Sequence, residues 1–508
     1  MLDFLDVSFV CKDDFISKLQ EIYKDDDDFG NMELLIPLPL DELLNRLKKN
    51  VWFVIERPYV DRHYRDTYYT FFSSKFKKTG RNCIRVHIFE GKITEKELLE
   101  KELPDETIKL NDRYLGYFII RPLTHYILGR SLISPKALVT NNFVCCLTKD
   151  QVSLLGKNLT VYGFPHIAQD AETHTCAESA LWSYIEYFGT KYSQYKPLLP
   201  SKIIKTLLDS TEHRILPSIG LTEKELAKCL NDNGFQCQIH DNASDSGTTQ
   251  FFQLLRTYVE SGIPLLLFLE NERDAHAVLV IGHEMDEAFY DLGKYVNHSL
   301  EDPWMDTSFV DKKMVFIDDH CPPYQIANIS EPTAHYNNEM KDMNIKSFIV
   351  TLPVHMFLVA EKVYDLLGII FNDPDVGLQT SGGKWITRLL LTGSQSFKNF
   401  LSNYDNQMVK EIKNSLLYLS LPKYIWLCEL YKADNFKENG YCSGLLLIDA
   451  TSNGKSLTPV LFYAKEDKLF DHDGGAWKKG DDIVSFKMST YKNNLKGEWS
   501  KWQSGMSS

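Results

Sequence analysis

Apolar residues recur along the chain at two different spacings, and each spacing predicts a different kind of element. Short runs rich in β-branched and aromatic residues, bounded by Pro, Gly or Asn, predict strands. In the first third of the chain such runs occupy residues 51–55, 83–89 and 116–120. Apolar residues three and four positions apart predict a helix from Ala177 to Phe188. The chain therefore begins with a small mixed block and continues with a helix.

After this helix, the middle of the chain is predicted to be mainly strands. Residues 220–230 and 251–259 have the spacing of two further amphipathic helices. Strands are then predicted at residues 263–269, 276–283 and 314–320. The second of these strands is apolar at consecutive positions, which indicates burial on both faces of its sheet.

The last part of the chain combines both patterns. Residues 385–391 and 397–401 have helical spacing, whereas residues 444–449 and 459–463 predict strands. Because a single core rarely exceeds about 250–300 residues, a chain of 508 residues is predicted to form several domains. We expect an α+β fold with a central domain and two flanking mixed domains. The expected domains are residues 1–154, 155–370 and 371–508.

Composition and charge limit the classes of partner. The formal net charge is −13, which argues against nucleic acid as the main partner, because phosphate binding needs a basic face. No run of about 18 apolar residues occurs, so we expect no membrane span. The ten cysteines are scattered without a CxxC pair, and the first residues lack a secretory signal. These features predict a cytoplasmic protein with free thiols.

The start of the helix near residue 176 carries the most informative chemistry. Thr175 followed by Glu178 is a capping box, which makes Cys176 the first helical residue, and Gly189 is expected to end the helix. The N–H groups and dipole at a helix N-terminus favour a thiolate, the nucleophile of acyl transfer. Gln169 precedes this helix, and its amide can donate to an oxyanion beside the N–H of Cys176.

A base for this thiol is predicted on a later strand. His276 begins the apolar strand 276–283, so its ring can face the helix N-terminus and exchange a proton with Cys176. A third group must orient the imidazole, and Asp318 and Asp319 lie on the next predicted strand. Because side chains alternate along a strand, only one aspartate can face His276. We favour Asp319, with Asp318 as the alternative acid.

The remaining histidines and cysteines are weaker candidates. His283 and His320 are less favoured bases, and His174 is either a neighbour of the site or a loop residue. Histidines and cysteines lack the paired spacing of zinc ligands, so we predict no metal and no cofactor.

These residues together resemble the papain-like cysteine peptidases. The resemblance is carried by Gln169 and Cys176 at a helix start, Gly262-Ile263-Pro264 before a strand, and His276-Ala277-Val278-Leu279-Val280 on the next strand. The nearest branch includes the double-glycine leader peptidases of bacteriocin exporters, and the likeness covers residues 155–335.

The resemblance implies a helix carrying the cysteine, packed on an antiparallel sheet that carries the histidine and the aspartate. It also implies hydrolysis of a peptide or isopeptide bond in a protein or peptide substrate, with Gln169 as oxyanion donor. The stretch from His276 to Asp319 is longer than is usual in this branch, and its insert at 286–311 is expected to form a flap over the cleft.

Two other functions remain open. A transglutaminase-like acyl transferase uses the same triad but passes the acyl group to an amine. A catalytically inactive papain-like binding module would keep the scaffold alone. The joint presence of Gln169, Cys176 and His276 argues against this second alternative, because binding alone requires none of the three.

Overall fold

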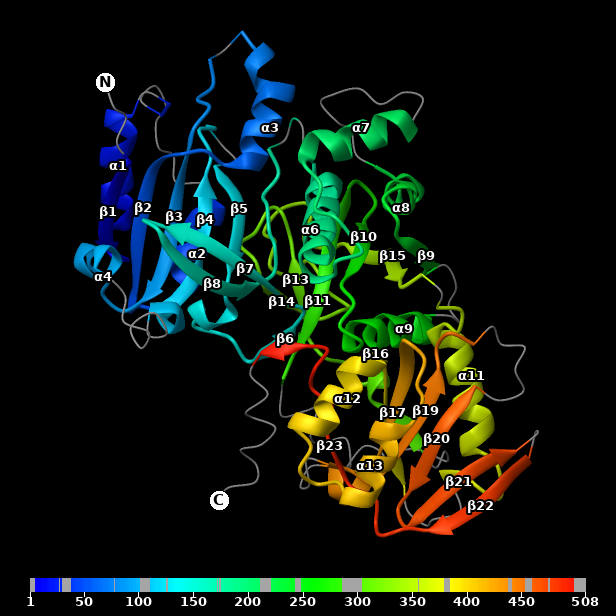
Figure 1. Cartoon of the computed structure of the whole chain (residues 1–508). Helices are drawn as coiled ribbons and strands as arrows, with labels where there is room; N and C mark the ends of the chain where they lie inside the picture. The colour runs from blue at the N-terminus through cyan, green and yellow to red at the C-terminus, as the bar shows by residue number, and fades with distance from the viewer. Residues whose placement is uncertain are drawn as a thin grey trace.

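A computed structural model gives the fold of the chain (Figure 1). It describes residues 5–497 except for 27, 30–37, 77, 101–109, 125–126, 171, 173–174, 211–220, 243–247, 286–303, 355, 379–383, 437–440, 453–458 and 474–475. The fold is mixed α+β, as predicted, and its three largest sheets are mainly antiparallel. No helix in these described ranges is long and apolar enough to cross a membrane.

The first sheet is a five-stranded antiparallel meander, and it contains all three strands predicted in this part of the chain. Its strands, in spatial order, are β1 (Asp6–Cys11), β2 (Val51–Tyr59), β3 (Cys83–Glu90), β4 (Tyr114–Ile120) and β5 (Leu128–Ile133). The helices of this part include α1 (Phe15–Asp25), α2 (Leu38–Arg46), α3 (Arg62–Thr70) and the short α4 (Glu95–Leu99).

Both faces of this sheet are buried. Phe53 and Phe118 pack with Phe15 of α1 on one face. On the other face, Tyr117 and Ile119 share a core with the hairpin of β7 (Thr148–Leu154) and β8 (Lys157–Gly163). This burial on both faces explains why the strands are nearly continuous apolar runs.

The second sheet lies at the centre of the chain and draws its strands from all parts of the sequence. Its main path is β14 (Gln325–Ala327), β13 (Met314–Ile317), β11 (Ala275–Glu284), β10 (Leu265–Glu270), β15 (Asn344–Leu352) and β9 (Gln236–Asp241). Strand β6 (Phe143–Cys145) pairs with β11, and β24 (Lys496–Gly497) pairs with β6. In Figure 1 the red β24 lies beside β6, so the end of the described chain returns to the central sheet.

Four helices in the described part of the chain accompany the central sheet. They are α6 (Cys176–Lys191), α7 (Pro200–Ser210), α8 (Glu223–Asp232) and α9 (Thr248–Glu260). Helix α6 packs against β10 and β11, and α9 lies between this sheet and the third one (Figure 1). Helix α6 continues past Gly189 to Lys191, so the predicted helix end was wrong by two residues.

The third sheet has the order β12 (Trp304–Asp306), β16 (Trp385–Gly393), β17 (Tyr424–Lys432), β19 (Gly444–Asp449), β20 (Val460–Lys465), β21 (Lys468–Asp473) and β22 (Ala476–Asp482). Helices α11 (Ala360–Phe371), α12 (Ser394–Asn403) and α13 (Lys410–Tyr418) accompany it. Two residue pairs, β18 (Tyr441–Cys442) and β23 (Met488–Ser489), form a separate small ladder.

Residues 385–391, predicted as a helix, form strand β16 instead. Eight consecutive residues of β16 are buried, because it lies inside the sheet between β12 and β17. A strand buried on both faces is apolar at nearly every position, so its residues three and four apart also match a helical pattern. The predicted helix at 397–401 and the strands at 444–449 and 459–463 are confirmed as α12, β19 and β20.

The strand pairing crosses the expected domain boundaries. Strand β6 lies within 1–154 and β24 within 371–508, yet both extend the central sheet. In the insert expected to form a flap, residues 286–303 lie outside the described residues. The part that follows contributes β12, which pairs in parallel with β16 of the third sheet.

Candidate active site

Helix α6 presents Cys176 at its first turn. The capping box predicted from the sequence is present, and the Thr175 N–H donates to the Glu178 carboxylate at 3.1 Å. Such a cap stabilises a helix by about 1 kcal/mol and sets where it begins. The rest of α6 is largely buried, whereas Cys176 is partly exposed. The fold thus holds a reachable thiol at the N-terminus of a rigid helix.

Strand β11 places His276 against this thiol. His276 lies at the start of β11, opposite Leu269 of β10, and its side chain is buried. Its Nε2 lies 3.1 Å from Oδ1 of Asp318. The Cys176 side chain also acts on this imidazole, since it is one of the groups that raise the pKa of His276. Since Nε2 is directed at Asp318, Nδ1 is the nitrogen left for the sulfur.

Asp318 is itself fixed by two further donors. The Tyr336 hydroxyl donates to its Oδ2 at 2.8 Å, and the backbone N–H of His320 donates to its Oδ1 at 3.0 Å. A carboxylate that accepts several hydrogen bonds has little freedom to rotate. It therefore holds the His276 ring in one orientation, which is the task of the third member of a catalytic triad.

The electrostatics of this pair favour charge on both partners. Burial lowers the pKa of His276, but the Asp318 carboxylate and the Cys176 side chain outweigh it and raise that pKa well above 6.5. Burial raises the pKa of Asp318, but His276 in particular lowers it well below 3.8. The pair is therefore held as an imidazolium beside a carboxylate.

Of the two aspartates, the structure places Asp318 rather than the favoured Asp319 on the imidazole. Strand β13 ends at Ile317, so both aspartates lie in the turn beyond it and the alternation of strand side chains does not apply. Asp319 Oδ1 lies 3.8 Å from His276 Nε2, and neither of its oxygens has a hydrogen-bond partner among the described residues. Burial is the main reason that the pKa of Asp319 rises to about 7.

Gln169 reaches the site through His320. Its side-chain nitrogen contacts Nε2 of His320, whose ring centre lies 5.2 Å from that of His276. Burial, with His276 second, lowers the pKa of His320 to about 4, so this ring is neutral near pH 7 and can accept from the amide. Arg121 donates to the Gln169 carbonyl at 2.8 Å and fixes the backbone. One hydrogen of the amide remains for another acceptor.

No protein-family model matches the chain, and neither does any curated protein. What the chain does is therefore inferred from its own geometry.

The other histidine candidates for the base lie at different distances from His276. His283 lies seven residues further along β11, about 24 Å from His276 at 3.4 Å per residue, and its Nε2 contacts Glu260 at 3.0 Å. His174 lies outside the described residues. His320 belongs to the site, although as a partner of Gln169 and Asp318 and not as the base.

Sequence reasoning missed three residues around Asp318. They are Tyr336, His335 with its Nε2 at 3.6 Å from Oδ2, and His166 with its Nε2 at 3.1 Å from the Asp318 carbonyl. Tyr336 and His335 lie between β14 and β15, where no periodic pattern exists. Only the tertiary fold brings them to the carboxylate, so no local signal would have found them.

Two groups in the described part of the chain have metal-ligating atoms within 4.8 Å of one another. They are His276, Asp318 and Asp319, and Asp318, Cys321 and His335. Asp318 is common to both groups, and its two oxygens already accept from the imidazole, a phenol and a backbone N–H. The geometry around it is explained by the hydrogen bonds of a triad and needs no ion.

Proposed function

We propose that the chain is a cysteine peptidase of the papain-like kind, acting on a protein or peptide. Cys176 is the nucleophile, His276 the base and acid, and Asp318 the residue that orients the imidazole. The observation that carries the proposal is the buried His276–Asp318 pair at 3.1 Å, whose imidazole also interacts with the Cys176 side chain at the start of α6. A thiol that served only as a small apolar side chain would need neither partner.

In the proposed reaction the Cys176 sulfur attacks the carbonyl carbon of the scissile peptide bond. As the C–S bond forms, negative charge moves to the carbonyl oxygen. The N–H of Cys176 can donate to that oxygen, because a residue at the first helical position has no acceptor within its helix. The free hydrogen of the Gln169 amide is the proposed second donor.

His276 then completes the proton transfers. Its imidazolium gives a proton to the leaving nitrogen as the C–N bond breaks, which leaves a thioester on Cys176. Water attacks the thioester while His276 takes up its proton, and the products are a carboxylate and the restored thiolate–imidazolium pair. Asp318 stays ionised throughout the reaction and stabilises His276 whenever its imidazole is protonated.

The fold around the site supports the same proposal. A helix bearing the cysteine packs on a mainly antiparallel sheet, one strand of which bears the histidine, while the acid follows the neighbouring strand. All ten cysteines are free, which is in keeping with a reducing compartment such as the cytoplasm.

The first test is the reactivity of the cysteines towards iodoacetamide near neutral pH, followed by mass spectrometry. Cys11 and Cys237 are internal controls, because they are partly exposed like Cys176 while the other seven are buried. Cys176 is expected to react much faster than both controls and to lose this advantage in a His276→Ala variant. Equal rates for Cys176 and Cys11 in the wild type would remove the basis of the proposal and favour an inactive binding module.

A substrate screen follows if Cys176 is hyperreactive. Cleavage of a peptide library that is abolished by Cys176→Ser would establish hydrolysis. The same assay with an added primary amine tests the transglutaminase-like alternative, since an acyl transferase yields the amide and a peptidase yields mainly the acid.

A further inference from the structure

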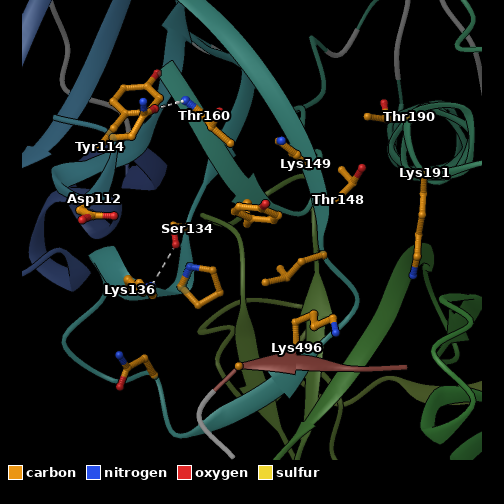
Figure 2. Close-up of a pocket in the computed structure, with 16 residues that line it drawn as sticks. Asp112, Tyr114, Ser134, Lys136, Thr148, Lys149, Thr160, Thr190, Lys191 and Lys496 are labelled. Carbon is orange, nitrogen blue, oxygen red and sulfur yellow. Dashed lines mark hydrogen bonds between the residues drawn. The ribbon is translucent and has the colours of Figure 1, made fainter. Parts of the chain in front are cut away.

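A cavity of about 810 Å³ opens at the end of helix α6 that is opposite to Cys176 (Figure 2). The helix has 16 residues, so at 1.5 Å per residue its two ends are about 22 Å apart. The walls come from the β7–β8 hairpin, the last turn of α6, the 3₁₀ turn Pro135–Ala137 and strand β24. The cavity is therefore separate from the proposed active site and joins parts of the chain that are distant in sequence.

Four lysines face this cavity, and each comes from a different element. Lys136 lies in the 3₁₀ turn, Lys149 in β7, Lys191 at the end of α6 and Lys496 in β24. Figure 2 shows the last three arranged around the hollow. Among the described residues of the lining, Asp112 is the one carboxylate, so these residues carry an excess of three positive charges.

Within the described ranges none of the four lysines forms an ion pair, although the whole chain has a net charge of −13. Burial, and after it the charge of Lys191, lowers the pKa of Lys496, so two of these cations repel each other. An anion placed between them would relieve this repulsion, and the concave wall would strengthen its attraction.

The remaining lining adds an aromatic face and hydroxyl groups. Tyr162 lines the cavity with its side chain 53% exposed. Thr148, Thr160 and Ser134 supply hydroxyls that can donate to an anion. The cavity volume falls in the range of small-molecule sites, about 300–1,000 Å³. Lysines bind phosphate as point charges, and an exposed aromatic ring is a surface on which a nucleobase can stack.

We propose that this cavity binds a small phosphate-bearing polyanion, and that a nucleoside polyphosphate is the class of ligand that fits it best. The phosphates would lie among Lys149, Lys191 and Lys496, and the base against Tyr162. The ligand would touch both α6 and β24, so its binding stabilises the contact between the central sheet and the end of the described chain. The proposal does not depend on the chemistry of Cys176.

The test is calorimetric titration of the full chain at low salt with two probes, ATP and inorganic triphosphate. Both are expected to bind, with an affinity that falls as the salt concentration rises. The variant Lys149→Gln/Lys496→Gln is expected to lose about tenfold in affinity for each lysine, or about 1.4 kcal/mol each. The matched control is Lys202→Gln/Lys205→Gln, which removes the same charge from exposed positions of α7 and should leave the affinity unchanged.

Tyr162→Ser separates a nucleotide from a bare phosphate chain. It is expected to weaken ATP binding and to leave triphosphate binding unchanged, and equal affinity for ATP before and after the change would overturn the nucleoside assignment. If the wild type binds neither probe, or if the control variant loses as much affinity as the cavity variant, the site itself is refuted. Repeating the titration with Cys176→Ser keeps these outcomes independent of the proposed peptidase activity.

Discussion

The two neighbouring aspartates offer a matched pair of substitutions that tests the triad directly. Near pH 6 the carboxyl of Asp318, whose pKa lies well below 3.8, is charged. That of Asp319, whose pKa is about 7, is then about nine-tenths protonated. Asp318→Asn therefore removes a negative charge from the imidazole, whereas Asp319→Asn replaces one neutral group by another.

The size of the effect follows from the burial of the Asp318–His276 pair. Both side chains are buried, and removing one partner of a buried ion pair costs about 3–5 kcal/mol. If Asp318→Asn removes about 3–5 kcal/mol of stabilisation from the protein with a protonated His276, that protonated form becomes about two to four orders of magnitude less populated. We expect alkylation of Cys176 to slow by a comparable factor in Asp318→Asn, and by no more than about twofold in Asp319→Asn.

The assay is the rate of iodoacetamide labelling of the Cys176 peptide near pH 6, followed by mass spectrometry and normalised to the Cys11 peptide of the same sample. His276→Ala provides the rate without a base. The reasoning is refuted if Asp318→Asn labels as fast as the wild type, or if Asp319→Asn is the slow variant. The second result would restore Asp319 as the orienting acid.

Three further predictions concern the same region and the sheet behind it. Since burial is the main cause that raises the pKa of Asp319 from 3.8 to about 7, the native state retains a proton that the unfolded chain releases. Stability should therefore fall by up to about 4 kcal/mol as pH rises from about 4 to 7. Asp319→Asn should abolish this loss. The thermal unfolding midpoint, measured from pH 4 to 8, should then change less with pH in the variant than in the wild type. Parallel profiles for the two proteins would contradict the prediction. Tyr336→Phe removes the 2.8 Å hydrogen bond to Asp318, and we expect about tenfold slower alkylation of Cys176. A rate equal to that of the wild type would mean that the phenol does not hold the carboxylate. Gly282→Ala would place a Cβ 2.1 Å from the Val144 carbonyl oxygen, so it should destabilise the protein by about 1–3 kcal/mol in thermal unfolding. Gly368→Ala, whose Cβ would meet nothing within 4 Å, is its control.

Short-range sequence patterns correctly predicted those parts of the site that depend on one helix or one strand alone. The start of α6 follows from the Thr175–Glu178 capping box, and the placement of His276 follows from an apolar strand after a short turn. The choice between the aspartates failed because it assumed that strand β13 extends through them. Where a strand ends depends on its neighbours in the sheet, which the sequence pattern does not show.

The long-range pairings had no local signal at all. Strands β6, β12 and β24 have only two or three residues each, too few for a periodic pattern, and all three pair with strands distant in the sequence. The α+β class could be predicted because it depends only on which segments have the apolar spacing of helices and which have that of strands. How distant strands pair into three sheets depends on contacts across the whole chain, and so does the lysine-lined cavity, whose walls come from distant parts of the sequence.

The pairing of β24 with β6 has a consequence for the newly made chain. Ribosomes add about 5–20 residues per second, so roughly tens of seconds separate the synthesis of β6 from that of β24. During this time the edge of β6 that β24 will occupy carries unpaired backbone N–H and C=O groups, the kind of edge to which other strands add. The nascent chain therefore passes through a period of exposure to chaperones and to aggregation that lasts until β24 docks on β6.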